Sequence, residues 1–387
     1  MNRIIPGGMD ASTFLEIYWQ KQPCLIRQAQ SDFKPFISKQ ELFELACKDD
    51  VESRLILESA GDYPWQVTQG PFCEDDFIKL PISHWTLLVQ NSELHLPEAL
   101  AFLNQFQFIP NWRIDDLMIS LAPEHGSVGP HLDSYDVFLF QAMGRRRWSI
   151  NVQDFNEDDF IDGLDLRIIE HFQAEQEWLL EPGDMLYLPP GVAHHGVALD
   201  DCMTFSVGLR APSRHELLGH YLDDMPGEGD DLRYTDPDLS LQSHCGEITK
   251  EDLEKIDALF RSALPDKNTL AEWFGSYVTR LPENYEPQPA VPQMNVESFI
   301  EAFKNKSCLS KNTAARTAFT RGDEHINLFV NGERYTLPVA LEEFICLFSQ
   351  SEMFDNPLLA QNVLFSEIAD LLCQLYNNGV IIINDSD

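Results

Sequence analysis

A His-Leu-Asp triplet begins at His131, and a Pro-Pro-Gly turn at 189–191 leads to the adjacent residues His194 and His195. Side chains alternate along an extended backbone, so His131 and Asp133 are expected to point to the same side of the chain. Two histidines and one carboxylate hold Fe(II) on one face of an octahedron and leave the other positions open. The sequence therefore predicts a metal site at His131, Asp133 and a distant histidine. His194 is the candidate, and His195 is the neighbour to exclude.

A lone His-x-Asp pair is common by chance, so it does not by itself indicate a metal site. The segments between this pair and His194 provide further support. An apolar run at 137–141 has strand length, 142–144 reads as a turn, and 145–150 reads as a second strand. Residues 181–191 supply a turn, an apolar strand and another turn. This succession predicts a double-stranded β-helix, or cupin barrel, over about 113–210, which returns the last histidine to the barrel mouth.

The charge is strongly unbalanced, with 27 Lys and Arg against 63 Asp and Glu, a net charge of −36. Such a surface repels nucleic acid and anionic membranes and attracts cationic partners. Solubility alone accounts for the charge equally well. The length of 387 residues favours two or three domains.

The eight cysteines form no Cys-x-x-Cys pair, which argues against a zinc ribbon and a disulfide framework. The first residues lack the apolar stretch of a signal peptide, and no run approaches the roughly 20 apolar residues of a membrane span. We therefore expect no membrane partner and a reducing, cytoplasmic location.

Several motifs together resemble known proteins. The His131-x-Asp133 pair, the basic residue Arg146, the Pro-Gly-Asp turn at 182–184 and the spacing of His194 after Pro-Pro-Gly resemble the JmjC/cupin 2-oxoglutarate oxygenases. Further segments resemble the bacterial ribosomal oxygenases, so that the resemblance covers most of the chain. These segments are Phe14 to Pro23, Asp115 to Ser120, Gly144 to Trp148 and Ser206 to Pro212.

The resemblance implies an enzyme that hydroxylates an arginine side chain of a basic large-subunit ribosomal protein, with Fe(II), 2-oxoglutarate and molecular oxygen. It also implies His194, rather than His195, as the third ligand. The tail carboxylate of 2-oxoglutarate needs a cation, and Arg146 can bind it through two parallel hydrogen bonds. By alternation, Arg145 and Arg147 should face away from Arg146. The family pattern implies Ser120 as a second hydrogen bond to that tail.

Tyr135 and Asp136 follow the metal-binding pair directly, so each is a candidate for contact with the substrate, and a structural role in the barrel is equally compatible. Two alternatives to arginine hydroxylation stay open. The enzyme could act on another protein residue, as a histidyl hydroxylase or a lysine demethylase. The chain could instead be a non-catalytic cupin that binds a partner.

Beyond residue 212 the pattern changes from strands to helices, so the overall prediction is an α+β protein of three domains. These are a JmjC/cupin catalytic domain at 1–212, a helical dimerisation domain at 213–281 and a winged-helix-like domain at 282–387. Capping patterns place helix starts after four residues, Ser38, Ser213, Thr249 and Thr269.

An apolar stripe follows Thr249 at helical spacing, and such stripes are more often internal core than partner surface. The resemblance nevertheless implies a homodimer through this region. Residues 281–294 contain four prolines and read as a linker. The last domain lacks a dense basic helix, so we expect a scaffold without direct nucleic-acid binding.

Overall fold

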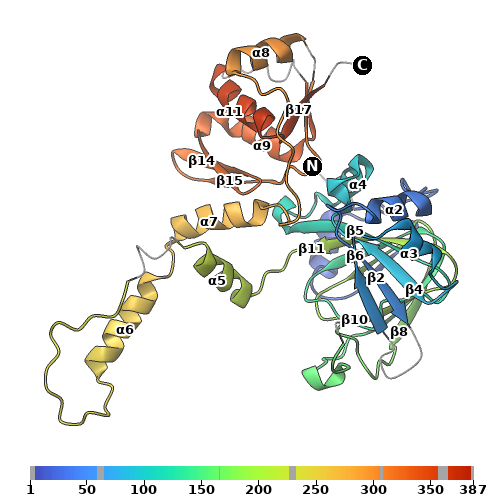
Figure 1. The fold of residues 1–387 in the computed structure, drawn as a ribbon, viewed down its shortest axis with the longest axis horizontal. Coiled ribbons are helices and arrows are strands. Elements are labelled where there is room, and N and C mark those ends of the chain that lie inside the picture. Colours follow the sequence, from blue (N-terminus) through green and yellow to red (C-terminus); the bar gives the residue numbers. More distant parts are fainter. Residues whose placement is uncertain are drawn as a thin grey trace. The chain divides into compact units, whose positions relative to one another are not determined.

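The computed structural model describes residues 5–58, 65–164, 166–225, 232–305, 308–355 and 365–384 (Figure 1). Predictions that fall on 59–64, 226–231 and 359–364 lie outside these residues. Among the described residues, no helix is both long enough and apolar enough to cross a membrane.

The N-terminal part is rich in strands. Its strands are β1 (Cys24–Ile26), β2 (Ser53–Glu58), β3 (Trp65–Gln69), β4 (Trp85–Val89), β5 (Ile114–Ala122), β6 (Val137–Met143), β7 (Arg146–Asn151), β8 (Gln176–Leu180), β9 (Met185–Leu188), β10 (Ala193–Ala198) and β11 (Cys202–Leu209). Its helices are α1 (Ala11–Ile17), α2 (Lys39–Ala46), α3 (Glu74–Ile78) and α4 (Pro97–Leu103). Short 3-10 helices cover Ser92–Leu94, Asn104–Phe106, Asn111–Arg113 and Glu157–Asp159.

The remainder alternates helices with short strands. Its helices are α5 (Arg214–Asp223), α6 (Lys250–Ser262), α7 (Lys267–Thr279), α8 (Val296–Asn305), α9 (Glu342–Gln350) and α11 (Phe365–Asn377), with a 3-10 turn at Val339–Leu341. Its strands are β12 (Cys308–Lys311), β13 (Thr317–Arg321), β14 (His325–Val330), β15 (Glu333–Pro338), β16 (Met353–Asp355) and β17 (Ile381–Asn384).

Two antiparallel sheets form the predicted double-stranded β-helix. The larger has the order β1-β9-β6-β11-β5-β4-β2-β3, and the smaller has the order β10-β7-β8. Strands distant in sequence are therefore neighbours, because β6 lies between β9 and β11 and β7 lies between β8 and β10. With the small sheets and helices that follow, the predicted α+β class with a cupin barrel is confirmed.

Alternating side chains of β6 serve two separate cores. Phe138 and Phe140 belong to the large core that includes the N-terminal helices. Val137 and Leu139 belong to a second core with Trp148 and other residues of the smaller sheet. Because neighbouring residues point to opposite faces of a strand, a continuous apolar run is what a strand buried on both faces requires.

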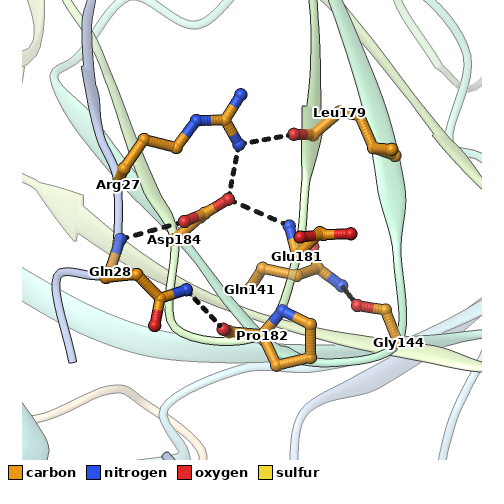
Figure 2. Close-up of polar contacts among 8 residues, drawn as sticks. All are labelled: Arg27, Gln28, Gln141, Gly144, Leu179, Glu181, Pro182 and Asp184. Atoms are coloured by element: carbon orange, nitrogen blue, oxygen red, sulfur yellow. Dashed lines mark hydrogen bonds and ion pairs between the residues drawn. The ribbon is translucent and has the colours of Figure 1, made fainter. Parts of the chain in front are cut away.

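The Pro-Gly-Asp turn connects β8 to β9, and the buried carboxylate of Asp184 holds this turn in place. Asp184 is 2% exposed and accepts hydrogen bonds from Arg27 Nη1 at 2.5 Å, the Gln28 amide at 2.9 Å and the Glu181 amide at 3.1 Å (Figure 2). Gly183 has φ +93°, and a Cβ there would lie 2.4 Å from the Gln30 carbonyl oxygen. Glycine is therefore required, and the turn fixes the strand that leads to His194.

Three of the four predicted helix starts are confirmed. Ser38, Ser213 and Thr249 each cap a helix through a reciprocal capping box. The prediction at Thr269 is wrong, because α7 begins at Lys267 and its cap is Asp266, whose carboxylate accepts from the Thr269 amide. Aspartate at the earlier position satisfies the same first-turn amides.

Internal contacts divide the chain into two compact units. One comprises 1–211, 281–315 and 350–387, and the other comprises 212–280 and 316–349. In the second unit the β14–β15 hairpin turns at Asn331 and Gly332, both with positive φ, as a two-residue hairpin turn requires. This grouping cuts across the predicted three-domain division, which stays a prediction.

Candidate metal centre

His131 and His194 lie opposite each other in an isolated antiparallel bridge. The His131 amide donates to the His194 carbonyl at 3.0 Å, and the His194 amide donates to the His131 carbonyl at 2.8 Å. This pairing brings the two ring centroids to 4.3 Å. The bridge is the only regular pairing in the motif, since residues 132 and 133 belong to no strand.

Asp133 completes a group of three convergent ligand atoms. Its carboxylate oxygens lie 4.0 Å from His131 Nε2 and 3.7 Å from His194 Nε2. One ligand atom from each of the three residues lies within 4.8 Å of the others. Within the described residues, this is the one cluster of three or more His, Cys, Asp or Glu side chains with such spacing. The arrangement is the two-histidine, one-carboxylate set that suits Fe(II).

Backbone carbonyls fix the tautomer of both histidines. His131 Nδ1 lies 3.0 Å from the Gly129 carbonyl oxygen, and His194 Nδ1 lies 3.0 Å from the Val192 carbonyl oxygen. A carbonyl only accepts, so each Nδ1 carries the proton and each Nε2 keeps its lone pair. Both Nε2 atoms are thus prepared to bind a metal.

His194 and His195 have different surroundings. Burial, with a contribution from His131, lowers the pKa of His194 to about 4, so its imidazole is neutral at pH 7. His195 does not line the cavity at this site, and its ring packs edge-on against Phe172 at 6.0 Å. The cupin register therefore aims His194 at the ligand cluster and His195 away from it.

Arg146 supplies a buried cation without a carboxylate partner among the described residues. The residue is 2% exposed, and its Nε has no hydrogen-bond partner. Its terminal nitrogens make only long contacts, at 3.4 Å to Ser120 Oγ, 3.4 Å to Thr204 Oγ1 and 3.3 Å to the Gly196 carbonyl. A buried charge so weakly paired is costly unless an anion binds to it. The guanidinium therefore fits the tail carboxylate of 2-oxoglutarate.

The predicted alternation around Arg146 is also found. Arg146 is buried while Arg145 and Arg147 are both exposed. Arg145 forms an ion pair with Asp200, with Nε at 2.8 Å from the carboxylate. The strand thus turns one of three consecutive guanidinium groups inwards.

A cavity of about 330 Å³ joins the ligand cluster to Arg146. Ser120 lines it and is 4% exposed, so this predicted residue lies beside the guanidinium. Tyr135 lines the cavity and is 40% exposed, which leaves its ring accessible to a substrate. All three metal-ligand candidates line the same cavity.

Asp136 lies elsewhere. Its carboxylate is fully buried and accepts from Tyr187 Oη at 2.6 Å, Gln20 Nε2 at 2.9 Å and Arg113 Nη2 at 3.2 Å. It does not line the cavity, so of the two roles left open for Asp136 these contacts favour the structural one. The bonds tie the end of the metal-binding segment to the N-terminal region and to the start of β5.

Sequence reasoning missed several lining residues. Thr204 contacts Arg146 from β11, and Arg54 enters from β2 with a buried Nε that has no partner. Trp148 lines the cavity next to Arg146, with 5.2 Å between the guanidinium carbon and the ring centroid. Alternation from Arg146 could have indicated Trp148, two residues further along the strand. Thr204 and Arg54 carry no local signal, since only the sheet order brings them to the site.

Three family models match the chain. Residues 101–217 match the JmjC domain, and residues 261–381 match the ROXA-like winged helix. The AraC-like ligand binding domain matches residues 170–266.

Similar proteins cover most of the chain. The Ribosomal protein uL16 3-hydroxylase of Escherichia coli is 35% identical over 84% of this chain and 85% of its own length. The Probable ribosomal oxygenase of Haemophilus influenzae is 32% identical over 85% of this chain and 83% of its own length. The structure of the Escherichia coli ribosomal oxygenase YcfD with cobalt and 2-oxoglutarate superposes with a TM-score of 0.79 at 31% identity, covering 96% of this chain and 97% of that chain.

Proposed function

The chain belongs to the ribosomal oxygenases, a family of JmjC-domain proteins, and on this premise we propose that it hydroxylates an arginine side chain of ribosomal protein uL16. The cofactor would be Fe(II) at His131, Asp133 and His194, with 2-oxoglutarate and molecular oxygen as cosubstrates. The observation that carries the proposal is the convergence of three ligand atoms beside the weakly paired guanidinium of Arg146.

The names of the relatives support the substrate. The Escherichia coli relative is named for hydroxylation of uL16, and the name specifies position 3. The YcfD structure holds cobalt, a divalent metal, together with 2-oxoglutarate. A basic ribosomal protein also complements the net charge of −36, which disfavours direct binding of nucleic acid. A ribosomal-protein substrate agrees with the cytoplasmic location expected from the sequence.

When bound, Fe(II) and 2-oxoglutarate supply the activation of oxygen, with succinate and carbon dioxide as by-products of hydroxylation. The chain's own residues bind and orient. Arg146 would hold the tail carboxylate of 2-oxoglutarate, and Ser120 would donate a further hydrogen bond to it. The neutral imidazoles and the Asp133 carboxylate would fix the metal on one side of the cavity.

Apolar side chains restrict water around the reacting atoms. Val137, Leu139 and Ile168 line the cavity and are buried, and Trp148 covers the guanidinium. Charge interactions are stronger where water is excluded. Tyr135 lies at the accessible side, where we propose that it contacts the substrate side chain.

Mass spectrometry of purified uL16 after incubation with the enzyme, Fe(II), 2-oxoglutarate and oxygen tests the proposal. We expect a gain of about 16 Da on an arginine, with succinate formed in equal amount, and no gain with Asp133→Ala. Modification of a histidine, or loss of a methyl group from lysine, would favour the alternative reactions. Partner binding that survives Asp133→Ala, without succinate formation by the wild type, would favour a non-catalytic cupin.

A second proposal concerns assembly as a homodimer. No described residue of α5 or α6 is buried in the isolated chain. On α6, Leu253, Ile256 and Phe260 lie on one face and are 55%, 49% and 69% exposed. An apolar face of this kind is typical of a protein interface. Light scattering should give twice the chain mass for the wild type and the single chain mass for Ile256→Asp. A monomeric wild type would contradict this.

A further inference from the structure

The larger sheet ends at β3. Within the described residues, β3 pairs only with β2. The Gly70 amide donates to the Ser53 carbonyl at 2.8 Å, which continues the ladder between these strands. Because hydrogen-bonded pairs alternate in an antiparallel ladder, residues 66 and 68 direct their backbone groups to β2. The outward-facing backbone groups therefore belong to Trp65, Val67 and Gln69.

A groove follows this edge and adjoins the catalytic cavity. It has a volume of about 400 Å³, with residues 65–68 on one side and Gly163, Leu164 and Leu166 on the other. Leu166 lines both the groove and the cavity. The neighbouring strand β2 contributes Arg54 and Ile56 to the cavity. A chain lying in the groove would thus pass beside the cavity that contains the ligand cluster.

The two edges of the larger sheet differ in how well they are protected against pairing with a further strand. At the opposite edge, β1 has only three residues, a length that discourages added strands. In contrast, β3 has five residues, Trp-Gln-Val-Thr-Gln, without proline or charge. Natural edge strands usually carry such protection, so an open edge next to an active site points to a binding role.

We propose that the edge of β3 binds the polypeptide that flanks the target residue, as an added β-strand. This inference rests on the proposed function and names how that substrate is held. An extended peptide presents alternating amides and carbonyls that match the free groups of an edge strand, while its side chains remain available to the catalytic cavity. The backbone pairing supplies affinity without regard to sequence.

Charge near the groove complements a basic occupant. The wall opposite β3 is formed by Gly163, Leu164 and Leu166. In the sequence, these residues belong to a segment, 153–167, with six Asp or Glu residues and one arginine. A basic segment of a ribosomal protein would be attracted to this wall, and an acidic segment would be repelled.

The first test is made on the substrate, with the wild-type enzyme. Peptides of uL16 that contain the target arginine are methylated at one backbone nitrogen at a time, on either side of the target. Methylation removes a donor, so we expect the KM to rise about tenfold at every second position of one flank and to stay unchanged at the positions between. KM values that do not alternate from one methylated position to the next would overturn the inference. Absence of turnover with the unmethylated peptide would instead overturn the proposed function.

The second test is made on the enzyme. Val67→Pro removes one outward amide from an edge strand, where proline leaves the ladder to β2 intact. Val67→Ala is the matched control, since it shortens the side chain and keeps the amide. We expect Val67→Pro to raise the KM for a long uL16 peptide about tenfold and to leave a short peptide without flanks unaffected. Equal KM values for both variants on the long peptide would contradict the added strand, and the substrate test stands even if Val67→Pro fails to fold.

Discussion

Arg146 shows how one residue defines the chemistry that a cavity accepts. The guanidinium is buried among neutral partners at 3.3–3.4 Å, and its Nε is unpaired. Burial lowers the pKa of this group from its ordinary value, but an arginine side chain stays charged at neutral pH. The site therefore keeps a positive charge that an incoming carboxylate can neutralise.

Arg146→Lys should raise the KM for 2-oxoglutarate at least tenfold, because lysine presents a point charge instead of a two-pronged donor. Steady-state succinate formation at varied 2-oxoglutarate measures the effect. Arg147→Lys is the matched control, since Arg147 is exposed on the other face of β7, and its KM should equal that of the wild type. Equal changes in both variants would rule out the assigned role of Arg146.

The contacts of Asp136 favour a structural role for this carboxylate. Its carboxylate is shared by Tyr187, Gln20 and Arg113, and removing it would leave a largely buried guanidinium without its carboxylate partner. We expect Asp136→Ala to lower the free energy of unfolding by about 3 kcal/mol. Urea denaturation measures the change. As a control, replacing the exposed Asp154 by Ala should lower the free energy of unfolding by less than about 0.5 kcal/mol. A similar small cost at Asp136 would contradict the structural role.

At the scale of elements, a single carboxylate links α5 to the end of α7. Asp224 accepts from Trp273 Nε1 at 2.7 Å and from Arg280 Nη2 at 2.6 Å. Burial alone would raise the pKa of Asp224, but the hydrogen bonds and charge of its partners hold it below its ordinary value of 3.8. The folded state thus favours the carboxylate more than the unfolded state does.

The sign of the resulting pH dependence follows from this lowered pKa. The stabilisation by Asp224 is present above the unfolded pKa and is lost as the pH falls through the lower folded pKa. The wild type should exceed Asp224→Asn in unfolding free energy by about 1 kcal/mol near pH 6, and by less as the pH falls below about 4. Urea denaturation across this range measures the difference. A constant difference at all pH values would exclude titration of Asp224 as its source.

A helix or strand could be predicted from the sequence when residues close to it in the chain stabilise it. Helices α2, α5 and α6 were predicted at their first residues, because a capping box lies within four residues of sequence. Strands β12 and β16 were missed, since they contain four and three residues and exist by pairing with each other across a long stretch of chain. Short strands of this kind carry too little periodic signal to be read locally.

For the whole molecule, the succession of turns and strands predicted the cupin barrel, but the order of strands in its sheets could not be read from residue patterns. The relatives confirm the family resemblance. The ligand candidates could be named from the sequence because the His-x-Asp motif and the Pro-Pro-Gly turn indicate one site, and the structure brings these three side chains together. The position of Asp136 could not be predicted, because only tertiary packing decides which of two neighbouring side chains turns inwards. Thr204 and Arg54 reach the cavity through sheet order alone.

The central claim is that His131, Asp133 and His194 bind one metal ion next to Arg146. X-ray diffraction at the cobalt absorption edge, from crystals grown with Co²⁺ and 2-oxoglutarate without oxygen, tests it most directly. We predict one anomalous peak, from a cobalt ion bonded to both Nε2 atoms and to the Asp133 carboxylate. The tail carboxylate of 2-oxoglutarate should contact the Arg146 guanidinium. An empty cluster under these conditions, or a peak held by other residues, would contradict the account.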